Sequence, residues 1–209
     1  MELYRTILKE AEEEQTILKS RFIARVKPVT SKEEADEFIN RIKKENRDAT
    51  HNVPAFVIGD KMQLQWASDD GEPQGTSGAP MVKLMTQMNL TNMVIVVTRY
   101  FGGIKLGTGG LVRAYTSSAK LGIEKAGIGV VHEMTAIDYE MDYASYSKLE
   151  SIKSDNFSLE SADFGENVTV CVSCEPDESE GLESTLVNLT GGKGKILKIS
   201  KKILTKPIM

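Results

Sequence analysis

Residues 93–115 combine glycines with basic and hydroxyl side chains in a pattern that can hold an anion. The apolar run at residues 93–97 predicts a strand buried on both faces, followed by a glycine-rich loop and a helix beginning near Gly110. Glycine lets backbone N–H groups approach a ligand closely, and a helix N-terminus adds unpaired donors and partial positive charge. Because Lys105 and Thr108 lie in this loop, we expect an anion-binding site here.

The glycine loop departs from both common nucleotide-binding motifs. Gly102 and Gly107 have the spacing of a Walker A loop, but Thr108 occupies the position of its lysine. Gly107 and Gly109 match the start of a dinucleotide fingerprint, but Val112 occupies the position of its last glycine. The alternative is a structural role, in which the glycines serve a tight connection and close helix–strand packing.

A second polar segment, residues 68–80, places three carboxylates in a turn before a helix that Ser77 is expected to cap. Because Mg²⁺ often binds one or two carboxylates together with a substrate phosphate, this segment is a secondary candidate site. The alternative is a solvated turn with helix caps. The secondary candidate residues are Asp69, Asp70, Glu72, Gly75 and Thr76.

His51 begins a predicted strand and is the nearby histidine that could act as a general acid or base. No nucleophile is paired with it in the sequence, and a structural hydrogen-bonding role beside Asn52 is the alternative. The sequence therefore assigns no catalytic residue, no metal and no cofactor.

The charge of the chain is unevenly distributed. The 209 residues carry a net charge of −4 and are 40% hydrophobic, as expected for a globular protein. Residues 73–123 contain no Asp or Glu, residues 138–189 contain 13 acidic residues and two lysines, and six lysines without an acid follow from Lys193 on. The net charge argues against a general nucleic-acid coat, but the acid-free stretch is either a phosphate-binding region or a buried one.

Targeting and crosslinking signals are lacking in the sequence. The polar start MELYR does not have the pattern of a signal peptide, and no apolar run approaches the length of a membrane span. Two cysteines do not make a disulfide framework. We therefore expect a soluble, cytoplasmic protein with no membrane partner.

Hydrophobic periodicity predicts the elements of the first 129 residues. Ser31 and Glu34 form a capping box followed by apolar residues at helical spacing, which predicts a helix over residues 31–46. The helix after Ser77 carries four apolar side chains that we expect to fill the core: Met81, Leu84, Met85 and Met88. The third helix is expected to end near Gly127. The other predictions are two strands within residues 4–29 and strands at residues 51–58 and 62–68.

After Gly129 the pattern changes to the order βαββαβ. The predicted strands cover residues 136–141, 157–164, 168–174 and 195–204, and the predicted helices cover residues 144–154 and 178–188. This order is typical of the split, ferredoxin-like arrangement. We therefore predict an α+β protein with two domains, residues 1–129 and residues 130–209.

Four long motifs resemble the signature of the IMPACT family, in its two-domain bacterial YigZ branch. They are KSRFIA at residues 19–24, ATHN at 49–52, SDDGEPQGTSG at 68–78 and VTRYFGGIKLGTGGLVRAY at 97–115. The resemblance implies that the N-terminal domain is like domain 2 of a small-subunit ribosomal protein. It implies that the C-terminal domain is similar to the last, ferredoxin-like domain of elongation factor G. It also implies a link to translation, because eukaryotic relatives are translation regulators.

These observations favour a non-catalytic, translation-associated regulator that binds RNA or the ribosome across the basic face of the N-terminal domain. Arg99, Lys105 and Arg113 would hold backbone phosphate, and an aromatic side chain of the loop would stack a base. The alternatives are a protein-interaction adaptor that docks through the acidic C-terminal domain or its lysine-rich tail, and a Mg²⁺-dependent enzyme acting on a phosphorylated small molecule or nucleotide. The candidate anion- or nucleic-acid-binding residues are His51, Asn52, Arg99, Tyr100, Phe101, Gly102, Gly103, Lys105, Gly107, Thr108, Gly109, Gly110 and Arg113.

Overall fold

The computed structural model describes residues 2–152 and 156–208, and these form a mixed α+β protein with two sheets. They divide into two compact units. The larger contains residues 3–131 and the chain from Thr205 on, and the smaller contains Glu2 and His132–Leu204. The domain bounds 1–129 and 130–209 stay a prediction. Within the described ranges, no helix is long and apolar enough to cross a membrane.

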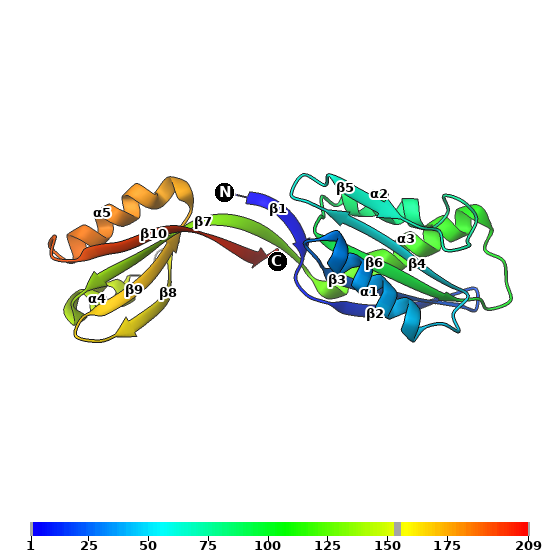
Figure 1. Cartoon of the computed structure of the whole chain (residues 1–209), viewed down its shortest axis with the longest axis horizontal. Coiled ribbons are helices and arrows are strands. Elements are labelled where there is room, and N and C mark those ends of the chain that lie inside the picture. The colour runs from blue at the N-terminus through cyan, green and yellow to red at the C-terminus, as the bar shows by residue number, and fades with distance from the viewer. Residues whose placement is uncertain (1, 153–155, 209) are drawn as a thin grey trace. The chain divides into compact units, whose positions relative to one another are not determined.

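An antiparallel sheet of order β2-β3-β6-β4-β5 is the framework of the larger unit (Figure 1). Two helices cover one face of this sheet and a third helix covers the other. The elements up to the end of the third helix are β1 (Glu2–Ile7), β2 (Ala11–Ile17), β3 (Ser20–Pro28), α1 (Lys32–Glu45), β4 (His51–Ile58), β5 (Leu64–Ala67), α2 (Gly78–Gln87), β6 (Met93–Tyr100) and α3 (Gly107–Ala126).

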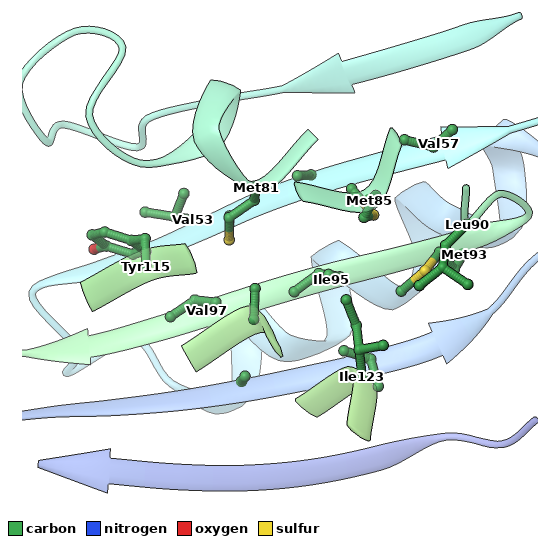
Figure 2. Packing of buried hydrophobic residues seen from close by; sticks show 14 of the residues in the cluster. Val53, Val57, Met81, Met85, Leu90, Met93, Ile95, Val97, Tyr115 and Ile123 are labelled. Atoms are coloured by element: carbon green, nitrogen blue, oxygen red, sulfur yellow. The ribbon is translucent and has the colours of Figure 1, made fainter. Parts of the chain in front are cut away.

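β6 lies between β3 and β4 and is buried on both faces, as its apolar run predicts. Met93, Ile95 and Val97 belong to the core under α2 and α3, whereas the alternating Val94 and Val96 pack with α1. Figure 2 shows the first of these faces, with side chains from both helices over the strand: Met81, Met85, Tyr115 and Ile123. The predicted core role of the apolar side chains after Ser77 is confirmed for Met81 and Met85, which are fully buried, whereas Leu84 and Met88 are only partly buried against the same core.

The N-terminal segment forms three strands where the sequence predicts two. β1 and β2 are separate strands, and β2 lies at the edge of the sheet. The middle of β2 is Glu12, Glu13 and Glu14, so this strand lacks the apolar alternation by which half-buried strands are recognised. Charged residues suit an edge strand because they discourage pairing with another chain. They also remove the apolar pattern from which the strand could have been predicted.

The capping box predicted for α1 is confirmed. Ser31 Oγ accepts a hydrogen bond from the Glu34 N–H (3.2 Å), and the helix ends at Glu45 with Asn46 as its C-cap. The Glu34 carboxylate accepts from the N–H of Thr30, at 2.7 Å. These contacts satisfy donors that a helix start leaves unpaired.

The prediction that the Ser77 side chain caps α2 is wrong. Ser77 occupies the N-cap position, but its side chain does not accept a hydrogen bond from the helix. Asp69 does so instead, because its Oδ1 accepts from the N–H groups of Ser77 (3.1 Å) and Gly78 (2.9 Å). The Ser77 hydroxyl donates to the same oxygen, at 2.6 Å. A residue from the preceding loop therefore caps this helix.

α3 begins at Gly107 rather than near Gly110, and it ends at Ala126 as predicted. Glycine is a poor helix former, so the early start is not expected from local propensity. Leu111 and Tyr115 are buried against the sheet in the first turns of the helix. Tertiary packing of this kind supplies most helix stability in proteins and accounts for the longer helix.

The smaller unit has the predicted order βαββαβ, with strands in the order β10-β7-β9-β8. Alternating residues of its central strands, such as Tyr139 and Val170, form a core with α4 and α5. The predicted end of the first helix, Ser154, lies outside the described residues. The elements are β7 (Ile128–Met141), α4 (Tyr143–Ser151), β8 (Phe157–Phe164), β9 (Val168–Cys174), the short 3₁₀ helix η1 (Pro176–Glu178), α5 (Ser179–Leu189) and β10 (Lys195–Pro207).

Replacing Asp69 should destabilise the protein because it removes the cap of α2. For Asp69→Ala we expect the free energy of unfolding, measured by urea denaturation at pH 7, to fall by about 1–2 kcal/mol. Asp36→Ala is the matched control, since Asp36 is exposed on α1 and should cost less than about 0.5 kcal/mol. Equal losses for the two variants would contradict the capping role.

The Asp69 contribution should also depend on pH. Burial acts to raise the pKa of Asp69, but hydrogen bonds from Ser77, Gly75 and Gly78 outweigh it and hold the pKa below its ordinary value of 3.8. A carboxyl whose folded pKa is depressed stabilises the fold above its unfolded pKa, and this stabilisation is lost as the pH falls through the folded pKa. The difference between wild type and Asp69→Ala should therefore be constant above about pH 4 and shrink below it.

Candidate functional site

A pocket of about 410 Å³ lies in the larger unit where the end of β6, the loop that follows it and the start of α3 meet. This volume is in the range of sites that bind small ligands. Its lining combines apolar side chains with a few charged and polar groups, and consists of Thr50, His51, Glu72, Pro73, Arg99, Phe101, Lys105, Leu106, Gly107, Thr108 and Leu111.

Strand register brings the floor of the pocket together. Arg99 follows Met93, Ile95 and Val97 in the row of β6 that faces α2 and α3, at the end where the apolar core stops. In the sheet, Arg99 lies opposite His51 on β4 and Phe22 on β3. Because cross-strand partners share one face, the histidine and the arginine are held side by side at the pocket.

A tight turn before α2 adds Glu72 to the floor. Asp70 and Gly71 both have positive φ angles, 48° and 89°, and the Glu72 N–H donates to the Asp69 carbonyl at 2.9 Å. Asp-Gly is a favoured pair for this kind of turn, because both positions need the left-handed region. The turn directs the Glu72 side chain to Arg99 and places the carbonyl of Asp70 beside His51.

Arg99 and Glu72 form a buried ion pair. The Arg99 Nη1 lies 2.6 Å from Glu72 Oε1, and the two side chains are only 6% and 3% exposed. The hydroxyl of Tyr115 donates to the same oxygen at 2.7 Å. Burial and the Glu72 charge both raise the pKa of Tyr115, so this phenol stays protonated and keeps its donor role.

Arg99 retains one unsatisfied donor in this arrangement. Its Nε is buried and has no hydrogen-bond partner among the residues that the structure describes. The guanidinium group lies between two rings, 5.4 Å from the centroid of Phe22 and 5.4 Å from that of Phe101. These contacts hold the charge in place without satisfying the N–H group.

His51 is oriented by a backbone carbonyl. Its Nδ1 lies 2.7 Å from the Asp70 carbonyl oxygen, and because a carbonyl only accepts, Nδ1 carries a proton. In the neutral ring this leaves Nε2 as the acceptor, and Nε2 lies 3.9 Å from Glu72 Oε2. The histidine therefore presents the lone pair of Nε2 near the carboxylate.

The mouth of the pocket is formed by the start of α3. Leu106 is the N-cap of this helix and no side chain caps it, whereas Lys105 and Thr108 beside it are exposed. The ring of Phe101 is 46% exposed. The loop is fixed by Gly102, where a Cβ would lie 2.0 Å from the Lys19 backbone, so its glycine serves close packing.

The pocket brings together part of the predicted set. Asn52 is buried and bonded to Thr98 and to the carbonyl of Asn46, and Tyr100 lies on the other face of β6 with its hydroxyl near Asp48. The predicted residues in the lining are His51, Arg99, Phe101, Lys105, Gly107, Thr108 and Glu72. The predicted residues outside the lining are Asn52, Tyr100, Gly102, Gly103, Gly109, Gly110, Arg113, Asp69, Asp70, Gly75 and Thr76.

Tyr115 is the polar residue of the floor network that the sequence prediction missed. It follows Leu111 by four positions on the buried stripe of α3. A tyrosine at a core position needs a hydrogen-bond partner for its hydroxyl. This requirement could have identified Tyr115 as part of a polar network from the sequence. The other missed lining residues are Thr50, Pro73, Leu106 and Leu111.

The three carboxylates of the secondary candidate site have protein partners. Asp69 caps α2, Asp70 accepts from the Asn52 N–H (2.7 Å) and from Lys43 Nζ (2.5 Å), and Glu72 binds Arg99. Within residues 2–152 and 156–208 no group of three or more His, Cys, Asp and Glu side chains is placed to hold a metal ion. Each of these carboxylates therefore has a structural partner near the turn, and metal binding by them together with a substrate phosphate stays a prediction.

β10 makes up most of the lysine-rich tail, and part of the charge of this tail is paired within the smaller unit. Lys201 Nζ lies 2.8 Å from the Glu133 carboxylate, and Lys202 Nζ lies 3.2 Å from that of Glu160. Docking of a protein partner on this tail or on the acidic surface stays a prediction.

Removing the charge of one partner of the buried ion pair should destabilise the protein, because the charge of the other partner is then left buried and uncompensated. We expect Arg99→Met and Glu72→Gln each to lower the free energy of unfolding by about 3–5 kcal/mol. The double variant should cost clearly less than the sum, in urea denaturation of all four proteins.

The exposed pair Arg21–Glu14, with side chains 52% and 41% exposed, serves as the comparison. Breaking it should lower the free energy of unfolding far less than breaking the buried pair, because solvent screens an exposed ion pair. Additive losses for the double variant of Arg99 and Glu72 would show that the two side chains do not depend on each other.

Comparisons with known proteins match both parts of the chain. Residues 18–123 match the Impact N-terminal domain, and residues 140–193 match a domain of unknown function, DUF1949. The IMPACT family member YvyE of Bacillus subtilis is 40% identical over 194 residues, which cover 92% of this chain and 89% of that protein. The IMPACT family member YigZ of Escherichia coli is 35% identical over 141 residues, 66% of this chain and 69% of that protein.

Solved structures show the same likeness. A crystal structure described as a hypothetical protein is 28% identical, covers 96% of this chain and 98% of its own, and has a TM-score of 0.61. A structure described as the two-domain translational regulator Yih1 is 25% identical and covers 58% of this chain and 46% of its own. Its TM-score of 0.35 is too low to carry a structural argument. From the match over residues 18–123 and the relatives that span most of its length, this chain belongs to the IMPACT family, with a two-domain arrangement.

Proposed function

We propose that this protein is a translation-associated regulator that binds RNA, free or within the ribosome, through the pocket face of its N-terminal domain. The chain belongs to the IMPACT family, and the resemblance to that family implies the link to translation. The observation that carries the RNA-binding proposal is the uncapped start of α3 with Lys105 and the exposed ring of Phe101 beside it.

These groups suit the backbone and bases of single-stranded RNA. A helix N-terminus and a lysine attract phosphate, and an exposed aromatic ring offers a stacking surface that tolerates any base. Arg113, which is exposed one turn further along α3, extends the positive surface beyond the pocket. A site of this kind binds by charge and stacking, so its affinity falls steeply with salt.

Arg99 has a different role in this proposal from the one that the sequence favours. Its charge is paired with Glu72 and its side chain is 6% exposed, so it does not offer a free cation to an RNA backbone. Direct phosphate contacts are assigned to Lys105, to Arg113 and to the first N–H groups of α3. Arg99 holds the floor of the pocket and the ring of Phe101 in place.

The proposal includes the expectation that both domains are similar in fold to parts of the translation machinery. The N-terminal domain would be like domain 2 of a small-subunit ribosomal protein. The strand order β10-β7-β9-β8 supports the ferredoxin-like arrangement and the likeness of the C-terminal domain to the last domain of elongation factor G. Fold likeness is analogy, and the function rests on the site.

Removing the two exposed cations should weaken RNA binding without unfolding the domain. For Lys105→Ala/Arg113→Ala we expect affinity for single-stranded RNA to fall about ten-fold or more, and co-sedimentation with ribosomes at low salt to be reduced. The slope of log affinity against log salt should fall by roughly 0.7 for each phosphate that the variant no longer neutralises.

Lys120→Ala is the matched control. Lys120 is exposed further along the same helix, where it pairs with Glu124 at 3.7 Å, so its removal should leave RNA binding nearly unchanged. Equal losses in the control and the double variant would argue for general charge attraction rather than this site. A wild-type protein that stays in the supernatant with ribosomes and bulk RNA at low salt would overturn the proposed function.

A further inference from the structure

The pocket offers several hydrogen-bond donors to a phosphate at the start of α3. The first N–H groups of α3 lack intrahelical acceptors, and no side chain caps them. Lys105 adds an ammonium group and Thr108 adds a hydroxyl. A phosphodiester has two free oxygens and a single negative charge, whereas a phosphomonoester has three oxygens and a charge near −2 at neutral pH. The monoester therefore matches this donor set better.

An unsatisfied donor on a residue of the pocket lining is a second observation, independent of the helix end. Arg99 lines the same pocket, its side chain is 6% exposed, and its Nε lacks a partner within the described ranges. Buried donors are nearly always satisfied in folded proteins, and leaving one unpaired is costly. A ligand acceptor that reaches this group would satisfy it.

The charges of the pocket also favour a compact dianion. Of the lining residues, all of which the structure describes, Glu72 is the one acid, and its charge is offset by Arg99 at 2.6 Å. Lys105 and the α3 N-terminus then leave the mouth positive. His51 Nε2, 3.9 Å from Glu72 Oε2, adds a further polar group to the pocket.

The shape of the pocket favours the end of a chain or a single nucleotide. Its floor consists of Arg99 and Glu72, 5% and 8% exposed, so a strand cannot pass through the pocket from one side to the other. A volume of about 410 Å³ accommodates one nucleotide-sized group. One side of the Phe101 ring faces the Arg99 guanidinium, and its exposed part can stack a base.

We propose that the pocket recognises a phosphomonoester, presented by the terminal nucleotide of an RNA or by a free mononucleotide. The identification of the macromolecule as RNA rests on the proposed function. The phosphomonoester chemistry of the pocket does not depend on it. The phosphate lies at the α3 N-terminus beside Lys105 and Thr108, and the base lies on Phe101.

The test compares one short oligoribonucleotide in three forms, with a 5′-phosphate, with a 3′-phosphate and with hydroxyl groups at both ends. Binding is followed by fluorescence anisotropy at fixed salt, with competition by 5′-AMP, 3′-AMP and adenosine. We expect at least one phosphorylated form to bind about ten-fold tighter than the hydroxyl form, the change expected from an added charge-assisted hydrogen bond. A matching mononucleotide should compete, and adenosine should not.

Variants separate the pocket from the surrounding charged surface. Lys105→Gln should abolish the preference for the phosphorylated form, and Phe101→Leu should weaken all forms that stack a base. Arg113→Gln is the matched control, because Arg113 lies outside the pocket lining and should lower the affinity of every form by the same factor. Lys105 and Phe101 are exposed, and unchanged thermal unfolding midpoints would show that both variants fold.

The possible outcomes distinguish the two proposals. If all three RNA forms bind equally well, the phosphomonoester inference is overturned while RNA binding stands. If a mononucleotide binds and no RNA does, the pocket chemistry holds and the proposed function fails. Absence of binding by any phosphorylated ligand would overturn both, and a preference that survives Lys105→Gln would place the site elsewhere.

Discussion

The buried ion pair of Arg99 and Glu72 is the interaction on which the rest of the site depends. β6 runs through the centre of the sheet, and its alternation carries the apolar row of one face directly into Arg99. A guanidinium group at the end of a core must find a partner, because an unpaired charge there is very costly. Glu72 is that partner, and the turn that delivers it also orients His51 through the Asp70 carbonyl. One electrostatic requirement therefore arranges the whole pocket floor.

Stability alone does not account for this pair. Replacing a buried ion pair by apolar residues of similar size is often neutral or stabilising, so a purely structural position could have been filled by two hydrophobic side chains. The pair instead keeps a polar floor beneath the start of α3, with one donor of Arg99 unsatisfied. It also confines net positive charge to the mouth, where Lys105 lies exposed. This division suits a site that takes an anion from solvent.

Local patterns predicted the elements better than they predicted the site. The Ser31 cap, the buried strand β6 and the core methionines depend on neighbours along the chain, and each appears in the structure as expected. The partners of Arg99 depend on strand register, which sets it opposite His51, and on the positive φ angles of the turn before Glu72. Strand register and turn geometry are not visible in residue spacing. The sequence analysis therefore assigned the carboxylates to a separate candidate metal site.

The two interpretations of the glycine-rich loop apply to different glycines. Gly102 serves packing, because its backbone lies against Lys19 too closely for any side chain. Gly107 and the exposed residues after it leave the start of α3 open to solvent. The packed glycine anchors one end of the loop to the sheet, and the buried Leu111 and Tyr115 anchor the helix at the other. Because both ends are held by the core, the donors between them are ordered before a ligand arrives, and binding loses less conformational entropy than a mobile loop would. A single loop thus gains its binding geometry from the same packing that the structural interpretation invokes.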